Sequence, residues 1–161
     1  MILTTREDID APAEAVFAAL TYFEGFERAA MRRGAEVTRA DLPRAVLVGR
    51  GWRIRFDYRG KRRDLTAAIT AHEAPNGIAF DLTGKTANAR LAIDLLALSL
   101  RRTRVTVTLE IMPITLGARI FVQSMKLTRK RVNDRFAKRV KLFATTIDDK
   151  LRKPGIGSPQ L

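Results

Sequence analysis

The chain has 161 residues and carries 30 Lys and Arg against 17 Asp and Glu, a formal net charge of +13. Its 46% of hydrophobic residues can fill a core of ordinary size, which argues against a disordered or fibrous chain. It contains no Cys and a single His, so disulfides, thiolate catalysis and multi-histidine metal centres are excluded.

The N-terminal part of the chain predicts one strand followed by two short helices. Residues 2–9 mix apolar and polar positions as a strand does. Val16, Phe17 and Leu20 then recur at helical spacing, and a second helix is predicted over residues 24–33. Both helices therefore lie within a single connection between strands.

From Ala35 onward the pattern changes to strict alternation, which is typical of half-buried strands. A long strand ending near Tyr58 is predicted, with one apolar and one charged face. The residues of its apolar face are Val46, Val48, Trp52, Ile54, Phe56 and Tyr58. Four further strands follow after tight turns, with apolar positions at 65–71, 78–82, 89–95 and 105–111. Consecutive strands joined by tight turns indicate an antiparallel meander.

The C-terminal part predicts one long amphipathic helix that starts near Thr115 or Leu116. Its apolar stripe consists of Phe121, Met125, Val132, Phe136, Val140, Phe143, Ile147 and Leu151. The stripe misses one step at Thr128 or Arg129, where a polar residue interrupts it. We expect residues 1–153 to form one domain and residues 154–161 to be a flexible tail.

A helix with its side chains is about 10 Å wide, too narrow to cover a flat sheet of many strands. The sequence therefore predicts an α+β fold in which a curved antiparallel sheet of about six or seven strands wraps around the C-terminal helix. Such curvature leaves space between sheet and helix, and we expect a cavity there.

The segment Ala11-Pro-Ala-Glu-Ala-Val-Phe17, followed by the short second helix, resembles the START-like, or SRPBCC, helix-grip superfamily. This superfamily includes polyketide cyclase/dehydrase and lipid-transport proteins, and the resemblance covers nearly the whole chain in element order. It implies a deep apolar cavity that binds a lipid, an isoprenoid, a polyketide-like compound or another hydrophobic or amphipathic molecule. A cyclase- or dehydrase-type enzyme acting on an aromatic or polyketide substrate is the alternative, because positioning in a shaped cavity needs few titrating groups.

Seven residues of the strands and of the C-terminal helix are the candidates for lining this cavity. They are Trp52, Phe56, Phe121, Met125, Arg129, Val132 and Phe136. The aromatic members are equally compatible with an ordinary core, and the resemblance favours a cavity lining for some of them. Arg129 fills the gap in the helix stripe, where it either pairs with a buried Glu7 or extends to solvent at the rim.

No catalytic residue, metal site or cofactor is predicted. His72 lies next to Glu73 on a strand, so the two side chains point to opposite faces. Ser99 and Ser124 lack the flanking glycines of a nucleophile elbow. A binding protein is therefore favoured over an enzyme.

The positive charge is concentrated at the C-terminal end, where residues 115–161 carry 12 Lys and Arg against 3 Asp. No aromatic RNA-binding motif or helix-turn-helix spacing accompanies these residues, so the pattern favours a solvated helix face over a nucleic-acid site. Peripheral contact with an anionic membrane stays open. The N-terminus has no signal-peptide pattern and no apolar run reaches the roughly 20 residues of a membrane span, so we expect a cytoplasmic protein.

Overall fold

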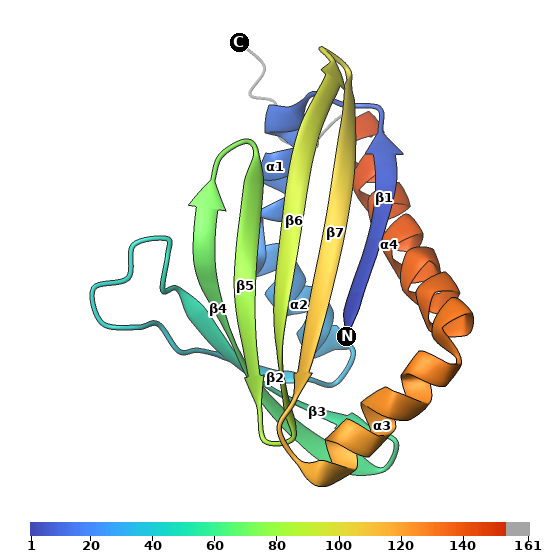
Figure 1. Ribbon diagram of the computed structural model, residues 1–161. Coiled ribbons are helices and arrows are strands. Elements are labelled where there is room, and N and C mark those ends of the chain that lie inside the picture. Colours follow the sequence, from blue (N-terminus) through green and yellow to red (C-terminus); the bar gives the residue numbers. More distant parts are fainter. Residues whose placement is uncertain (154–161) are drawn as a thin grey trace.

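The computed structural model describes residues 1–153, which form a seven-stranded antiparallel sheet and four helices (Figure 1). In chain order the elements are β1 (Ile2–Ile9), α1 (Ala13–Leu20), α2 (Phe23–Arg32), β2 (Glu36–Arg39), β3 (Gly51–Tyr58), β4 (Lys61–Glu73), β5 (Gly77–Gly84), β6 (Ala87–Ser99), β7 (Arg102–Pro113), α3 (Leu116–Leu127) and α4 (Arg129–Arg152). The tail predicted over residues 154–161 lies outside the described residues.

The strand order across the sheet is β1-β7-β6-β5-β4-β3-β2. Strands β3 to β7 follow one another as a meander, which confirms the sequence prediction, and β1 pairs with β7 so that Leu3 lies opposite Leu109. The sheet bends along its length, so that β2 and β3 run across the lower end of the molecule in Figure 1 while β6 and β7 run lengthwise.

The core lies between one face of this sheet and the helices α1 and α4. Side chains of alternating residues, among them Ile69, Ile93 and Val107, point to this face because successive residues of a strand point to opposite sides. Val16 of α1 and Ile147 of α4 complete the same buried cluster. The predicted arrangement, a curved antiparallel sheet wrapped around a C-terminal helix, is confirmed.

The prediction of one strand containing Val46 and Val48 is wrong, because residues 40–50 form a loop between β2 and β3. Val46 is 79% exposed. Gly49 adopts a φ of +90°, which side-chain-bearing residues rarely adopt, and its N–H donates to the carbonyl of Ile69 on β4. Because the carbonyl of Arg50 accepts from the N–H of Ile69 in return, the chain rejoins the sheet only at this point.

The prediction of one C-terminal helix is also wrong, since α3 and α4 meet at a bend at Thr128. The backbone there leaves the helical range at φ −114° and ψ 35°. The N–H and hydroxyl of Thr128 both donate to the carbonyl of Met125, at 3.1 and 3.4 Å. The bend coincides with the missing step of the apolar stripe, and α3 turns away from α4 toward the lower end of the molecule (Figure 1). Neither these two helices nor any other in residues 1–153 is long and apolar enough to cross a membrane.

Candidate ligand-binding site

An apolar cavity of about 280 Å³ lies between α2, the sheet and α4. It is lined by Leu20, Phe23, Phe26, Glu27, Ala30, Val37, Trp52, Ile54, Ala67, Phe80, Ile93 and Phe143. The helix α2 forms one wall because its residues 23, 26, 27 and 30 recur at helical spacing. The inward-facing residues of β2 to β6 form the floor.

Aromatic rings make up much of the cavity wall. The ring of Phe23 lies 5.0 Å from that of Trp52 and 6.4 Å from that of Phe80. Phe26 of α2 and Phe143 of α4 also line the cavity and contact each other, with their ring centroids 5.8 Å apart. These edge and tilted contacts hold the rings in place, so the cavity has a preformed aromatic wall.

Among the described residues that line the cavity, Glu27 carries the one charged side chain. Its Oε1 accepts a hydrogen bond of 2.6 Å from the indole Nε1–H of Trp52. The guanidinium of Arg39 lies 5.5 Å from the Trp52 ring and is paired with Asp41. Asp41 accepts hydrogen bonds from the N–H of Gly51 and from the guanidinium of Arg39, and these hydrogen bonds lower the pKa of Asp41. They also hold the end of β2 next to the start of β3 beside the cavity.

A second, open hollow of about 390 Å³ lies on the same face of the sheet, nearer the lower end of the molecule. Its floor follows the cavity floor along three strands: Phe56 follows Ile54 on β3, Leu65 precedes Ala67 on β4, and Leu82 follows Phe80 on β5. Each pair is two residues apart and thus shares a face. The cavity and the hollow therefore have one continuous apolar floor.

Arg63 interrupts this apolar face. It shares the inward parity of Leu65 on β4, lies opposite Phe56 in the β3–β4 register, and lines the hollow. Its Nε is buried and has no hydrogen-bond partner among residues 1–153. A buried N–H without an acceptor is unfavourable. The Nε atom itself is closed to solvent, but the half-buried Arg63 side chain lines the hollow, so its guanidinium is the cationic group that this part of the sheet face offers.

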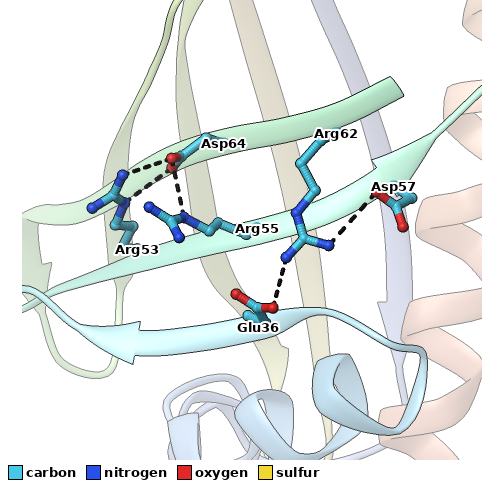
Figure 2. A network of polar contacts seen from close by, with 6 residues as sticks. All are labelled: Glu36, Arg53, Arg55, Asp57, Arg62 and Asp64. Carbon is cyan, nitrogen blue, oxygen red and sulfur yellow. Dashed lines mark hydrogen bonds and ion pairs between the residues drawn. The ribbon is translucent and has the colours of Figure 1, made fainter. Parts of the chain in front are cut away.

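The opposite face of β2 to β4 carries a network of ion pairs (Figure 2). Arg53 and Arg55 both contact the carboxylate of Asp64, at 2.8 and 3.3 Å, and Arg62 bridges Glu36 and Asp57. Hydrogen bonds from Arg53 and then Arg55 lower the pKa of Asp64. A carboxylate held in its charged form is a poor proton donor or acceptor near neutral pH, so this network is structural.

The structure places the seven candidate residues in different surroundings. Trp52 lines the cavity and Phe56 lines the hollow. Phe136 packs against the core cluster from α4, and Val132 is half-buried on the same helix. Phe121 is exposed and Met125 half-buried on α3, while Arg129 is exposed at the start of α4; none of these three lines either site.

Sequence reasoning missed the cavity residues of α2, although their helical spacing was visible. It also missed Arg63, whose signal is a charge at the parity of Leu65, Ala67 and Ile69. His72 lies outside the cavity, where its ring meets Phe17 edge-on at 5.2 Å. Within residues 1–153, no group of three or more His, Asp or Glu side chains is placed to hold a metal ion.

Comparison with solved structures defines the class of this fold. The Zhui aromatase/cyclase from a Streptomyces species matches 96% of this chain and 98% of its own at 16% identity, with a TM-score of 0.66. TTHA0849 from Thermus thermophilus matches 91% of this chain and 97% of its own at 18% identity and a TM-score of 0.64. A START superfamily protein from Mycobacterium smegmatis matches 83% of this chain and 95% of its own, at 15% identity and a TM-score of 0.53.

The chain therefore has the START-like helix-grip fold, as its sequence resemblance implied. At these identities the likeness concerns the fold. No protein-family model matches the sequence, and no curated protein does.

Proposed function

We propose that this protein binds an amphipathic small molecule with an anionic end group. The apolar part of the ligand occupies the cavity against Trp52 and Phe23, and the anionic group meets Arg63 in the hollow, beyond Phe56. Fatty acids, acidic isoprenoids and carboxylated polyketide-like compounds all have this chemistry.

The observation that supports this proposal most directly is the position of Arg63, a half-buried guanidinium that lines the hollow and whose Nε has no hydrogen-bond partner among residues 1–153. An apolar floor alone would suit any hydrophobic molecule. A guanidinium at the far end of that floor adds a preference, since charge-assisted hydrogen bonds from Arg to a carboxylate or phosphate are stronger than those between neutral groups.

Thermal-shift measurements with palmitate and with hexadecanol, which lacks the charge, test the proposal. A ligand at 100 times its dissociation constant stabilises the fold by about 2.7 kcal/mol, which is readily visible in the melting temperature. We expect palmitate to bind more tightly than hexadecanol, and Arg63→Gln to remove the difference. Equal binding of both compounds by the wild type would contradict the role of Arg63.

A matched pair of substitutions on α2 tests the cavity itself. Ala30 lines the cavity and its neighbour Ala29 does not. We expect Ala30→Phe to fill the cavity and abolish the shift, while Ala29→Phe, with the same change in volume, retains it. Binding that survives in Ala30→Phe would place the ligand elsewhere.

The alternative function is that of a cyclase-type enzyme on an aromatic or polyketide substrate. The fold likeness to an aromatase/cyclase and the Glu27 carboxylate inside an apolar cavity favour this candidate. Turnover of an aromatic polyketide analogue that is lost in Glu27→Gln, while binding of the analogue persists, would support catalysis. If the wild type binds the analogue without turning it over, the result contradicts the enzyme function and supports binding only.

A further inference from the structure

The helix α3 exposes large apolar side chains to solvent. Leu116, Ile120 and Leu127 are 73%, 62% and 88% exposed, whereas Val122 is the one residue of α3 that is buried. The three exposed residues stand four and seven positions apart, so they form one stripe along the helix. Exposed large apolar side chains gathered on one side of a helix, here with Gln123 on that side between Ile120 and Leu127, are typical of an interaction surface.

Basic residues surround this stripe. Arg119 and Lys126 lie on α3 beside it, and Arg129, Lys130 and Arg131 follow in the first turn of α4, all of them exposed. No Asp or Glu occurs between Glu110 and Asp134. The helix therefore combines an apolar stripe with a purely cationic border.

The loops that form the rim of the hollow add further basic residues at the same end of the molecule. The turn between β3 and β4 presents the exposed Tyr58 together with Arg59 and Lys61, and the turn between β5 and β6 presents Lys85. Tyr58, Lys85 and Thr86 line the hollow. The N–H of Ile114, just before α3, donates to the carbonyl of Thr86 at 2.9 Å, so α3 starts at this rim. Figure 1 shows α3 and both turns at the lower end.

We propose that α3 docks this end of the protein on an anionic lipid surface. The stripe of Leu116, Ile120 and Leu127 inserts among the acyl chains near the headgroups, and Arg119 and Lys126 contact anionic phosphates. An interfacial helix binds through these two terms, buried apolar area and attraction to anionic lipids. The hollow then opens close to the membrane.

Two other occupants fit the surface less well. Nucleic acid would neutralise the basic border and leave the apolar stripe in water. A second copy in a symmetric pair would cover the stripe but bring like charges of both copies together. An anionic membrane satisfies both features, and the proposal does not depend on the ligand in the cavity.

Vesicle sedimentation with the full chain tests the proposal. We expect the wild type to sediment with phosphatidylcholine vesicles that contain phosphatidylserine, less so with pure phosphatidylcholine, and progressively less as salt is raised. The triple substitution Leu116→Ser, Ile120→Ser and Leu127→Ser should weaken binding by roughly tenfold or more, because it removes the apolar area that inserts.

The matched control replaces two other exposed leucines with Ser: Leu96, near the C-terminal end of β6, and Leu100, in the turn that follows it. This turn lies at the other end of β6 from the β5–β6 turn. This variant should bind vesicles like the wild type, and unchanged melting temperatures would show that both variants are folded. The cavity-filling Ala30→Phe should still sediment, which separates a failure of this proposal from a failure of the ligand proposal. Absence of wild-type binding to anionic vesicles, equal binding by the triple variant, or a dimer that the triple variant disrupts would each overturn the inference.

Discussion

The indole Nε1–H of Trp52 donates a 2.6 Å hydrogen bond to Oε1 of Glu27, which joins β3 to α2 across the wall of the apolar cavity. Trp52 is 6% exposed, so this donor has little access to water. The contact both satisfies a buried polar group and sets the position of the ring against which we expect a ligand to pack.

Replacement of Glu27 tests the importance of this contact for stability. Glu27→Ala leaves the Trp52 N–H without its acceptor and should lower the free energy of unfolding by about 1–3 kcal/mol. Glu27→Gln retains an acceptor oxygen and should cost less. Urea unfolding followed by the fluorescence of Trp52 measures both, and a Glu27→Ala variant as stable as the wild type would contradict the prediction.

Two isoleucines of the C-terminal helices should respond differently to the same change. Ile147 of α4 is 3% exposed within the core, so Ile147→Ala should lower the free energy of unfolding by about 2–5 kcal/mol. Ile120 of α3 is exposed, and Ile120→Ala should stay within about 0.5 kcal/mol of the wild type. Chemical denaturation measures the free energy of unfolding of both variants. Similar losses in the two variants would mean that Ile120 of α3 is buried in solution, which would contradict the prediction.

Two glycines should likewise differ when replaced by alanine. A Cβ at Gly51 would lie 2.7 Å from the carbonyl oxygen of Ala40 and 2.9 Å from that of Ala67. Neither backbone atom can move cheaply, so Gly51→Ala should destabilise the protein by about 1–3 kcal/mol. A Cβ at Gly117 meets nothing within 4 Å, and Gly117→Ala should stabilise α3 by up to about 1 kcal/mol. We therefore expect the melting temperature to fall in Gly51→Ala and to rise in Gly117→Ala, and a change of the same sign in both would contradict the prediction.

Stability should fall on acidification partly through Asp8 and Asp64. Hydrogen bonds from Arg104 lower the pKa of Asp8, and those from Arg53 lower the pKa of Asp64. A lowered pKa contributes stability that is present above the unfolded value of about 3.9 and is lost as pH falls through the folded value.

The double variant Asp8→Asn and Asp64→Asn isolates this contribution. It should be less stable than the wild type near neutral pH, and the two should converge as the pH falls through the lowered pKa values of the folded protein, where both carboxylates become protonated. High salt should reduce the difference, because the pairs are partly exposed. Melting temperatures of the wild type and of the double variant, recorded as a function of pH, measure this difference in stability. A difference that stays the same at every pH would contradict the prediction.

The alternation of apolar residues was sufficient to predict the meander, because each of its strands has one buried face. The same rule failed at Val46 and Val48, which share the parity of Trp52. The chain leaves the sheet there in a loop, which is closed by hydrogen bonds from the N–H of Leu42 to the carbonyl of Gly49 and from the N–H of Ala45 to the carbonyl of Leu42. Such backbone contacts leave no periodic trace in the local sequence.

The site was less predictable than the fold. Trp52 was found because it lies on a clearly alternating strand, and Arg63 had the same kind of signal. The placement of Phe121 and Met125 could not be anticipated, because the bend at Thr128 directs α3 away from the sheet face that α4 covers. The contribution of α2 depends on how that helix packs over the sheet, which its own residues do not determine.

The pairing of β1 with β7 has a consequence for the order in which the chain acquires its structure. The hairpins of β3 to β7 form between neighbours in sequence, whereas the partners of the N-terminal segment come much later. Ile9 pairs with Thr103 in β7, and Asp10 contacts Arg152 at the end of α4. During synthesis from the N-terminus, the first strand must therefore wait without a partner until β7 and α4 emerge from the ribosome. Contacts between such distant segments form slowly, so docking of β1 and α4 should be the last and slowest step of folding.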